Sequence, residues 1–133
     1  YKLILKSGDF AVNFLPYESA ELIASVGGST GREVDKFSKF KIAKVKPLKI
    51  NAPILKDAFA AYECKLFAHN TYGDHEMVVG EVLAVHYLKE AFDDKGIINF
   101  DGVKPALYLG ADLYLSASKD VLRHLDRQAY GKR

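Results

Sequence analysis

The segment Tyr72-Gly73-Asp74-His75 and the apolar stretches on either side of it decide how this sequence folds. Glycine and aspartate side by side favour a tight turn, because glycine adopts unusual backbone angles freely and aspartate hydrogen-bonds to its own backbone. Tyr62 to His69 places Tyr62, Cys64, Leu66 and Ala68 on one face before the turn, and Met77 to Leu88 is long and mostly apolar after it. We therefore predict a β-hairpin whose turn lies within residues 70–74.

Gly80 and Glu81 interrupt the second apolar stretch, and they predict a sharp bend of the kind that barrel strands make. Glu81 must be exposed, paired or protonated, since an unpaired buried carboxylate is costly. The remaining pattern predicts strands over Asp9–Leu15 and Ala106–Tyr114, helices over Glu18–Val26 and from Ser118 to near Gly131, and a helical turn over Ile54–Ala60. Such a pattern is typical of a mainly β, barrel-like domain with short helical additions and a C-terminal helix.

Length and composition restrict the class of protein further. The 133 residues suffice for a single domain, residues 1–133, with its own hydrophobic core. Cys64 is the single cysteine, which predicts a buried, unreactive thiol and a reducing, cytoplasmic location. No apolar run approaches the roughly 20 residues of a membrane helix, so no membrane association is expected. The net charge of +2 is too small to indicate a nucleic-acid partner.

Lysines gather in one short part of the chain. Their alternation with apolar residues is typical of lysine stems that cover apolar surface while the ammonium groups stay in water. Lysines also protect the edges of sheets against unwanted pairing. We therefore predict a solvated face or sheet edge at Lys36, Lys39, Lys41, Lys44, Lys46 and Lys49.

Two other features are candidates for ligand binding. The loop Gly27-Gly28-Ser29-Thr30-Gly31-Arg32 combines flexible glycines, hydroxyl donors and positive charge, which suits a phosphate group. The same composition also fits a solvated turn before a helix. Asn13 places an amide within an otherwise apolar strand, where its partner is either the backbone of a loop or a ligand.

The histidines offer one further candidate. His69, His75, His86 and His124 lack metal-ligand spacing and a supporting thiol cluster, so no metal site is predicted. His75 differs from the others because it follows the Gly73-Asp74 turn, where a scaffold can aim a side chain into a site. A structural role as a cap of the hairpin fits this position equally well.

The hairpin and its neighbours resemble the flavin reductase-like family, and in particular its flavoredoxin-like branch. Residues 72–82 resemble the glycine-aspartate-histidine hairpin of that family. Other segments agree in order and spacing, so the resemblance covers nearly the whole chain: Phe10–Leu15, Gly31–Phe37, Pro53–Ala58 and Pro105–Gly110.

This resemblance implies an FMN-binding split β-barrel that forms a homodimer, with FMN at the dimer interface. It implies that electrons pass from NADH or NADPH through the flavin to an acceptor, which could be a redox partner protein. It places Lys36 near the flavin, His75 facing the flavin and nicotinamide, and Tyr108 beside the cofactor. Further cofactor-binding candidates are Asn13, Ser29, Thr30 and Arg32.

Members of the family carry strands upstream of the equivalent of Tyr1-Lys2-Leu3-Ile4. These strands include a serine- and threonine-bearing segment that helps to hold the flavin phosphate. Because Tyr1 leads directly into structured-looking sequence, we expect the domain to begin upstream of it.

Three functions are open on this basis. The first is an NAD(P)H-dependent flavin reductase, with FMN either permanently bound or exchanged as a substrate. The second is a non-enzymatic FMN-binding electron carrier of the flavoredoxin type, and the third is an interaction barrel with a lysine-rich face and no cofactor. In the first two, the redox chemistry belongs to the flavin and the protein supplies orientation and electrostatics, so no catalytic acid or base is named.

Overall fold

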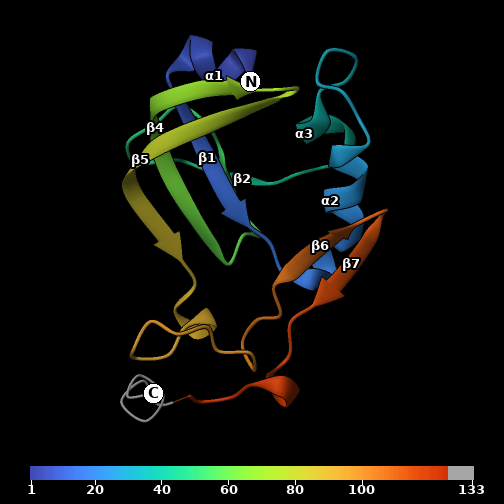
Figure 1. The fold of residues 1–133 in the computed structure, drawn as a ribbon, viewed down its shortest axis with the longest axis vertical. Coiled ribbons are helices and arrows are strands. Elements are labelled where there is room, and N and C mark those ends of the chain that lie inside the picture. Colours follow the sequence, from blue (N-terminus) through green and yellow to red (C-terminus); the bar gives the residue numbers. More distant parts are fainter. Residues whose placement is uncertain (126–133) are drawn as a thin grey trace.

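The computed structural model describes residues 1–125 and shows a mainly β fold (Figure 1). The main sheet has three antiparallel strands in the order β1-β4-β5, formed by β1 (Asp9–Phe14), β4 (Ala60–Tyr72) and β5 (His75–Tyr87). Two further antiparallel pairs are β2 (Lys44–Val45) with β3 (Ile54–Leu55), and β6 (Ala106–Gly110) with β7 (Leu113–Ser116). The short helices are α1 (Lys2–Ser7), α2 (Ala20–Gly27), α3 (Lys36–Lys39) and the 3-10 turns η1 (Tyr17–Ser19), η2 (Lys89–Ala91) and η3 (Lys119–Val121).

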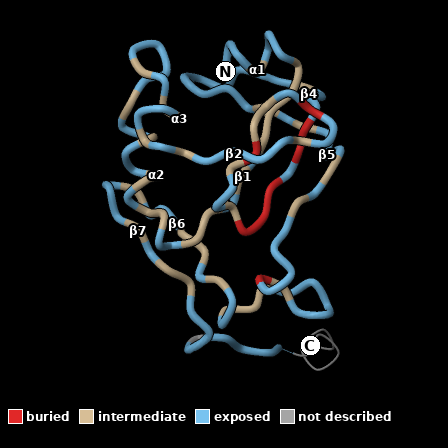
Figure 2. Tube along the Cα trace, turned by 180° about the vertical axis from the view of Figure 1, so that it is seen from behind, coloured by how far each residue is buried: buried red, intermediate tan, exposed pale blue. Residues whose placement is uncertain are grey.

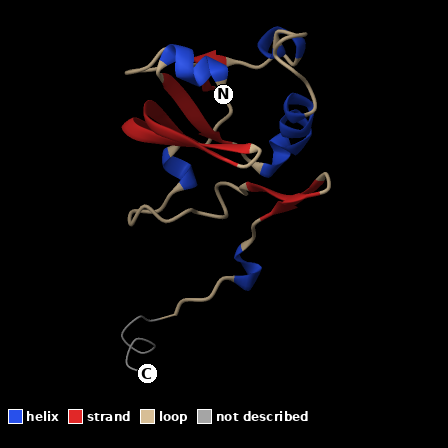
Figure 3. Ribbon diagram, turned by 45° about the horizontal axis from the view of Figure 1, so that its top comes forward, coloured by secondary structure: helices blue, strands red, loops and turns tan. Residues whose placement is uncertain are grey.

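The main sheet lies on one side of the molecule, and α2 and the β6–β7 hairpin lie on the other (Figures 1 and 3). Hydrogen bonds join the two sides where the chain leaves β1. The amide of Tyr17 donates to the carbonyl of Lys104 at 2.7 Å, and the amide of Ala106 donates to the carbonyl of Leu15 at 3.2 Å. None of the helices within residues 1–125 is long and apolar enough to cross a membrane.

Buried residues gather along the first half of β4 and just before it (Figure 2). Phe59, Ala60 and Ala91 form a small apolar cluster there, and Ala61 is fully buried. Cys64 is buried too, as predicted, and desolvation raises the pKa of its thiol. The described residues therefore pack most tightly around β4, the central strand of the main sheet.

The predicted hairpin is confirmed, and its strands run further toward the turn than expected. Tyr72 pairs with His75, so only Gly73 and Asp74 lie in the loop, and Gly73 has a φ of 62°. Near Gly80 and Glu81, where a bend was predicted, the pairing of β4 with β5 shifts twice: Leu83 of β5 is passed over between Glu63 and Cys64, and Phe67 of β4 is passed over between Leu66 and Ala68.

Gly80 lies opposite Leu66, beside the second register shift. A Cβ atom at Gly80 would lie 2.5 Å from Cζ of Phe10 and 2.9 Å from Cβ of Cys64. The glycine thus makes room for the Phe10 ring on the sheet. Glu81 was expected to be exposed, paired or protonated, and the structure shows that it is exposed.

Two of the predicted elements are wrong. Ile54–Ala60 is not a helical turn: it contains β3, because Ile54 and Leu55 pair with Val45 and Lys44 in β2. Ala106–Tyr114 is not one strand but most of the β6–β7 hairpin. Its turn contains Ala111 and Asp112 with φ values of 48° and 60°, left-handed angles that aspartate tolerates better than most residues.

The predicted C-terminal helix is only partly within the described residues. Lys119–Val121 forms the 3-10 turn η3, which begins where the Ser118 hydroxyl accepts a hydrogen bond from the amide of Asp120. Residues 122–125 are not helical, which corrects the prediction for that part. Residues 126–133, where the rest of the helix was predicted, lie outside the described residues.

Five of the six lysines predicted to form a solvated face are exposed, whereas Lys36 is half-buried, so the prediction is wrong for Lys36. Lys39, Lys41, Lys44, Lys46 and Lys49 are exposed. Two of them also cover aromatic rings: Nζ of Lys44 lies 4.6 Å from the ring centroid of Phe37, and Nζ of Lys39 lies 5.4 Å from that of Phe40. In both contacts the charged end itself lies over the ring, which is a cation–π arrangement and differs from the predicted covering by the lysine stems.

Candidate functional site

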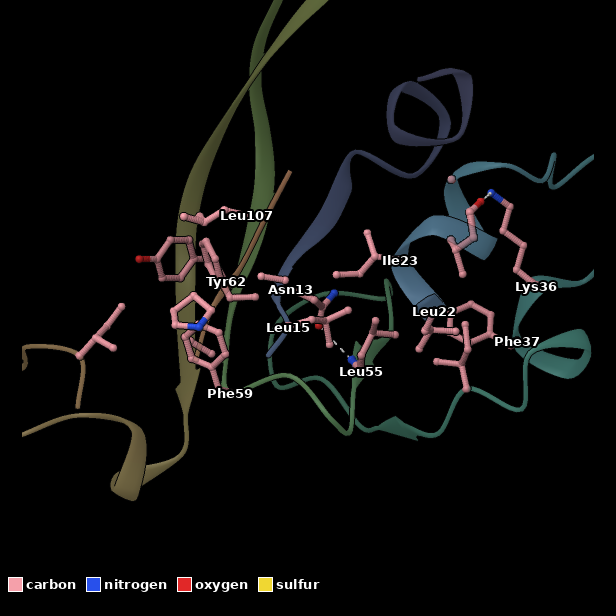
Figure 4. Close-up of a pocket in the computed structure, with 18 of the residues that line it drawn as sticks. Asn13, Leu15, Leu22, Ile23, Lys36, Phe37, Leu55, Phe59, Tyr62 and Leu107 are labelled. Atoms are coloured by element: carbon pink, nitrogen blue, oxygen red, sulfur yellow. Dashed lines mark hydrogen bonds between the residues drawn. The ribbon is translucent and has the colours of Figure 1, made fainter. Parts of the chain in front are cut away.

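A groove of about 810 Å³ runs along the outer edge of β1 (Figure 4). Its walls are mostly apolar and come from β1, α2, α3, β3, the start of β4 and β6. Phe37, Phe59, Tyr62 and Phe92 contribute aromatic side chains. This size and lining are typical of sites for cofactors and other small molecules, which need apolar walls and a few polar groups that set orientation.

Asn13 is one of the few polar residues of the groove. Its Oδ1 accepts a hydrogen bond of 2.9 Å from the backbone amide of Leu55, so the loop-backbone alternative considered for this residue is the one observed. Nδ2 of Asn13 has no hydrogen-bond partner among residues 1–125. This NH2 group can therefore donate to a molecule in the groove.

Lys36 lines the same groove at its α2 end, where Figure 4 shows its ammonium group turned toward the helix. Nζ of Lys36 donates to the carbonyl of Val26 at 2.8 Å, and the hydroxyl of Ser29 donates to the same carbonyl at 3.1 Å. A lysine has three protons to donate, so two remain for water or a ligand. The structure thus brings Ser29 and Lys36 together at the carbonyl of Val26, while Asn13 lines the groove elsewhere, on β1.

Thr30 and Arg32 lie in the exposed loop between α2 and α3. The hydroxyl oxygen of Thr30 accepts a hydrogen bond of 3.4 Å from the amide of Arg32. Neither residue lines the groove, although both are close in sequence to residues that do. The loop therefore has the exposed hydroxyl and guanidinium groups that a phosphate needs, at the edge of the groove.

His75 and Tyr108 lie away from the groove lining. The His75 side chain is 85% exposed at the tip of the β4–β5 hairpin, where Nδ1 lies 2.6 Å from Oδ1 of Asp74. Tyr108 is exposed on β6, and its ring centroid lies 5.1 Å from that of Tyr114 on β7. Its neighbours on the same strand, Ala106 and Leu107, line the groove instead.

Residues 36–55, which we call the wall segment, carry α3, β2 and β3 and bring Lys36, Phe37, Ile42 and Leu55 to the groove. The wall segment is attached to the sheet by Glu63, a residue that the sequence did not single out. Its carboxylate is fully buried and accepts hydrogen bonds from the backbone amides of Leu48, Lys49 and Ile50. Glu63 lies between Tyr62 and Cys64, so it is, like Glu81, a carboxylate within an apolar strand that must be exposed, paired or protonated.

The fold of the described residues matches those of solved flavin proteins. The chain resembles an FMN-binding protein from Thermus thermophilus with a TM-score of 0.80 and 32% identity, over 92% of this chain and 66% of that one. It also resembles a flavoredoxin of Desulfovibrio vulgaris with a TM-score of 0.82 and 19% identity, over 96% of this chain and 69% of that one. The protein therefore has the mainly β, split-barrel fold of flavin reductase-like proteins.

Residues 1–113 match the family described as the flavin reductase like domain, and the chain belongs to this family. The chain is also 34% identical to an uncharacterized protein of Pyrococcus abyssi over 94 residues, which is 70% of this chain and 53% of the relative. It thus spans just over half to about three fifths of the length of the first curated relatives it matches.

Proposed function

We propose that this protein binds FMN and acts as an oxidoreductase that passes electrons from NADH or NADPH through the flavin to an acceptor. The observation that carries the proposal is the aromatic-walled groove with Asn13 and Lys36 at its polar positions, in a chain 32% identical to a protein described as FMN-binding. The groove volume of about 810 Å³ lies within the usual range of cofactor sites, roughly 300–1,000 Å³.

The groove has the chemistry that the parts of FMN require. Phe37, Phe59 and Tyr62 offer apolar and aromatic surface to a flat ring system. Nδ2 of Asn13 would donate to an oxygen or nitrogen at the edge of that ring. The ammonium group of Lys36, with Thr30 and Arg32 in the adjacent loop, would attract the phosphate.

When bound, FMN supplies the redox chemistry itself, because its ring accepts and donates electrons. The chain's own residues orient the ring, exclude water from its apolar side and neutralise the phosphate. We assign His75 to the nicotinamide rather than to the flavin phosphate, since it is an exposed donor on a separate hairpin. We assign Tyr108 to the outer surface of the cofactor, because it is exposed beside a strand that reaches the groove.

We also propose a cytoplasmic homodimer with FMN at the interface between subunits. The open groove and the many exposed apolar side chains on the main sheet support an interface, among them Tyr62, Val82, Val85 and Tyr87. The lone buried cysteine supports a reducing compartment. Sedimentation of the FMN-loaded protein would test the dimer, and a monomer that retains FMN would exclude a shared site.

The visible absorption spectrum of the full-length protein as purified tests the proposed cofactor, with added FMN as a second condition. A flavin spectrum, or quenching of FMN fluorescence on addition, is expected. A colourless protein that leaves FMN fluorescence unchanged would favour an interaction barrel without a cofactor.

Stopped-flow mixing of the FMN-loaded protein with NADH, and separately with NADPH, tests the electron donor. Bleaching of the flavin absorption by at least one of them is expected. Retention of FMN without bleaching by either would make the protein an electron carrier that takes electrons from another protein.

A further inference from the structure

Glu63 is the most fully bonded acidic side chain of the described residues. Its Oε1 accepts from the amide of Leu48 at 2.7 Å, and its Oε2 accepts from the amides of Lys49 and Ile50 at 2.6 and 3.2 Å. Nε2 of His86, on the neighbouring strand β5, lies 2.5 Å from Oε1. A buried carboxylate that meets several N–H groups is held firmly, because hydrogen bonds to an ion are about twice as strong as neutral ones.

Asp9 and Asn13 on β1 repeat the arrangement. Oδ2 of Asp9 accepts from the backbone amide of Asn51 at 2.9 Å and from its side-chain Nδ2 at 3.2 Å, and Oδ1 of Asn13 accepts from the amide of Leu55. Asn13 pairs with Ala61 and Ala11 pairs with Glu63, so Asp9, Asn13 and Glu63 share one face of the main sheet. Side chains of this face thus hold the wall segment by binding the backbone amides of that segment.

Apolar contacts alone do not fix the place of the wall segment. Ile50 and Ile54 are buried, but hydrophobic burial has no directional preference. Leu48 is 70% exposed and Val45 is 40% exposed, and the β2–β3 pairing involves only two residues of each strand. The hydrogen bonds of Glu63, Asp9 and Asn13 are therefore the directional contacts that set the register of the segment on the sheet, and Glu63 makes the largest number of them to backbone amides.

The wall segment transmits this position to the groove. The amide of Lys56 donates to the carbonyl of Ala43 at 3.0 Å, and the amide of Ile42 donates to the carbonyl of Phe37 at 2.9 Å. Lys44 lies over the ring of Phe37, which lines the groove next to Lys36. Residues 48–50 lie in the loop between β2 and β3, and the β2–β3 pairing and these contacts join the two ends of that loop to Phe37 and Lys36 of the groove.

We infer that Glu63 is a positioning residue of the groove, which holds the wall segment so that Lys36, Phe37 and Ile42 keep their places around the ligand. This inference rests on the proposed function, because it names FMN as the ligand. Glu63 does not touch the ligand, since it is fully buried and does not line the groove. Its effect on binding is therefore indirect, through the backbone of residues 48–50.

Glu63→Gln in the full-length protein is the direct test, because it keeps the size of the side chain and removes its charge. Glu81→Gln is the matched control, since Glu81 is an exposed glutamate on the adjacent strand. Hydrogen exchange is measured at individual amides, and FMN affinity is measured by fluorescence quenching. In Glu63→Gln we expect the amides of Leu48, Lys49 and Ile50 to exchange roughly tenfold faster or more, and FMN to bind roughly tenfold more weakly.

The two measurements separate the possible failures. Unchanged exchange at residues 48–50 would overturn the role of Glu63 as an anchor, and faster exchange with unchanged FMN affinity would overturn its link to the groove. If the wild-type protein binds no FMN, the proposed function fails. The exchange rates at residues 48–50 would still test whether Glu63 holds the wall segment.

The control must keep the wild-type exchange rates at residues 48–50 and the wild-type FMN affinity. Exchange along β4 and β5 must stay slow in all variants, which shows that the sheet remains folded. A Glu81→Gln variant that loosened residues 48–50 as strongly would show a general charge effect and overturn the inference.

Should Glu63→Gln not fold, His86→Ala provides the milder variant, because it removes one of the donors to Glu63 at a partly exposed position. We expect it to speed exchange at Leu48, which shares Oε1 with His86, and no change there would count against the anchor.

Discussion

Glu63 and His86 share a hydrogen bond of 2.5 Å between Oε1 and Nε2, in which the glutamate side chain is fully buried and the histidine side chain is 26% exposed. The imidazole thus lies between the carboxylate and the solvent. Desolvation by burial would raise the pKa of Glu63, but the hydrogen bonds from Leu48, His86 and Lys49 together outweigh it and lower the pKa. The carboxylate consequently stays ionised at neutral pH inside the protein.

This ionisation predicts a specific loss of stability in acid. Because the pKa of Glu63 is lower in the folded protein than its unfolded value of 4.5, the ionised group stabilises the fold above that pH. The contribution is lost as the pH falls through the pKa of the folded state. Urea unfolding between about pH 7 and pH 3 should show a steeper loss of unfolding free energy in the wild type than in Glu63→Gln. Equal pH dependence in the two proteins would contradict it.

Gly80→Ala should destabilise the fold by about 1–3 kcal/mol, because its Cβ would overlap the ring of Phe10 and the side chain of Cys64. Gly31→Ala is the control, since no atom lies within 4 Å of the Cβ position there and Gly31 is exposed. Chemical denaturation measures both variants. A Gly80→Ala protein as stable as Gly31→Ala would show that Phe10 moves aside at no cost.

Two variants of Asn13 should distinguish its structural role in the groove from its role in binding FMN. Asn13→Ala leaves the amide of Leu55 without its acceptor, and we expect a loss of about 1–3 kcal/mol in stability together with weaker FMN binding. Asn13→Asp keeps an acceptor for Leu55 but removes the free NH2 group, so it should weaken FMN binding with a smaller loss of stability. Equal FMN affinity of Asn13→Asp and the wild type would remove Asn13 from the binding site.

Lys36 and His75 should affect different steps, because one lies in the groove and the other at the tip of a separate hairpin. We expect Lys36→Ala mainly to weaken FMN retention and His75→Ala mainly to slow reduction of the flavin by the nicotinamide. Fluorescence titration measures retention, and stopped-flow absorption measures reduction. Similar effects of the two variants on both quantities would contradict this division of roles.

Cys64 should react slowly with thiol reagents in the native protein. The residue is 4% exposed, and burial raises the pKa of the thiol, so little thiolate is available to react. Labelling with a chromogenic disulfide reagent should be slow in buffer and complete in denaturant. Rapid labelling under native conditions would mean that β4 opens readily, since this strand carries the tightest part of the core.

Local sequence patterns predicted the main strands well because their signals are short-range. The Gly73-Asp74 turn and the apolar segments beside it are enough to define the β4–β5 hairpin, and the same holds for β1 and α2. β3 was missed because its pairing with β2 joins residues separated by a loop, and two-residue strands carry almost no periodicity. The second turn, at Ala111 and Asp112, lacks the asparagine-glycine pair that marks a hairpin most clearly.

The candidate site was predictable in part for a similar reason. Asn13 and Lys36 stood out as a polar residue in an apolar strand and as a residue of a recognisable motif, and the structure brings both to the groove. Glu63 could not be distinguished from Glu81 by its neighbours in sequence. Only the folded chain reveals that one glutamate meets three backbone amides and the other meets water.

The three anchors on the sheet are Asp9, Asn13 and Glu63. They accept hydrogen bonds from the backbone amides of residues 48–51 and 55, and the only side-chain atom of these residues that they bind is Nδ2 of Asn51. The exposed side chains of Leu48 and Lys49 can therefore be exchanged without loss of the course of the chain, whereas Ile50 is buried and Leu55 lines the groove. Proline is the exception, because it lacks the N–H that each anchor requires. The sheet thus tolerates many different residues at positions 48 and 49 while forbidding a single residue type at each anchored amide.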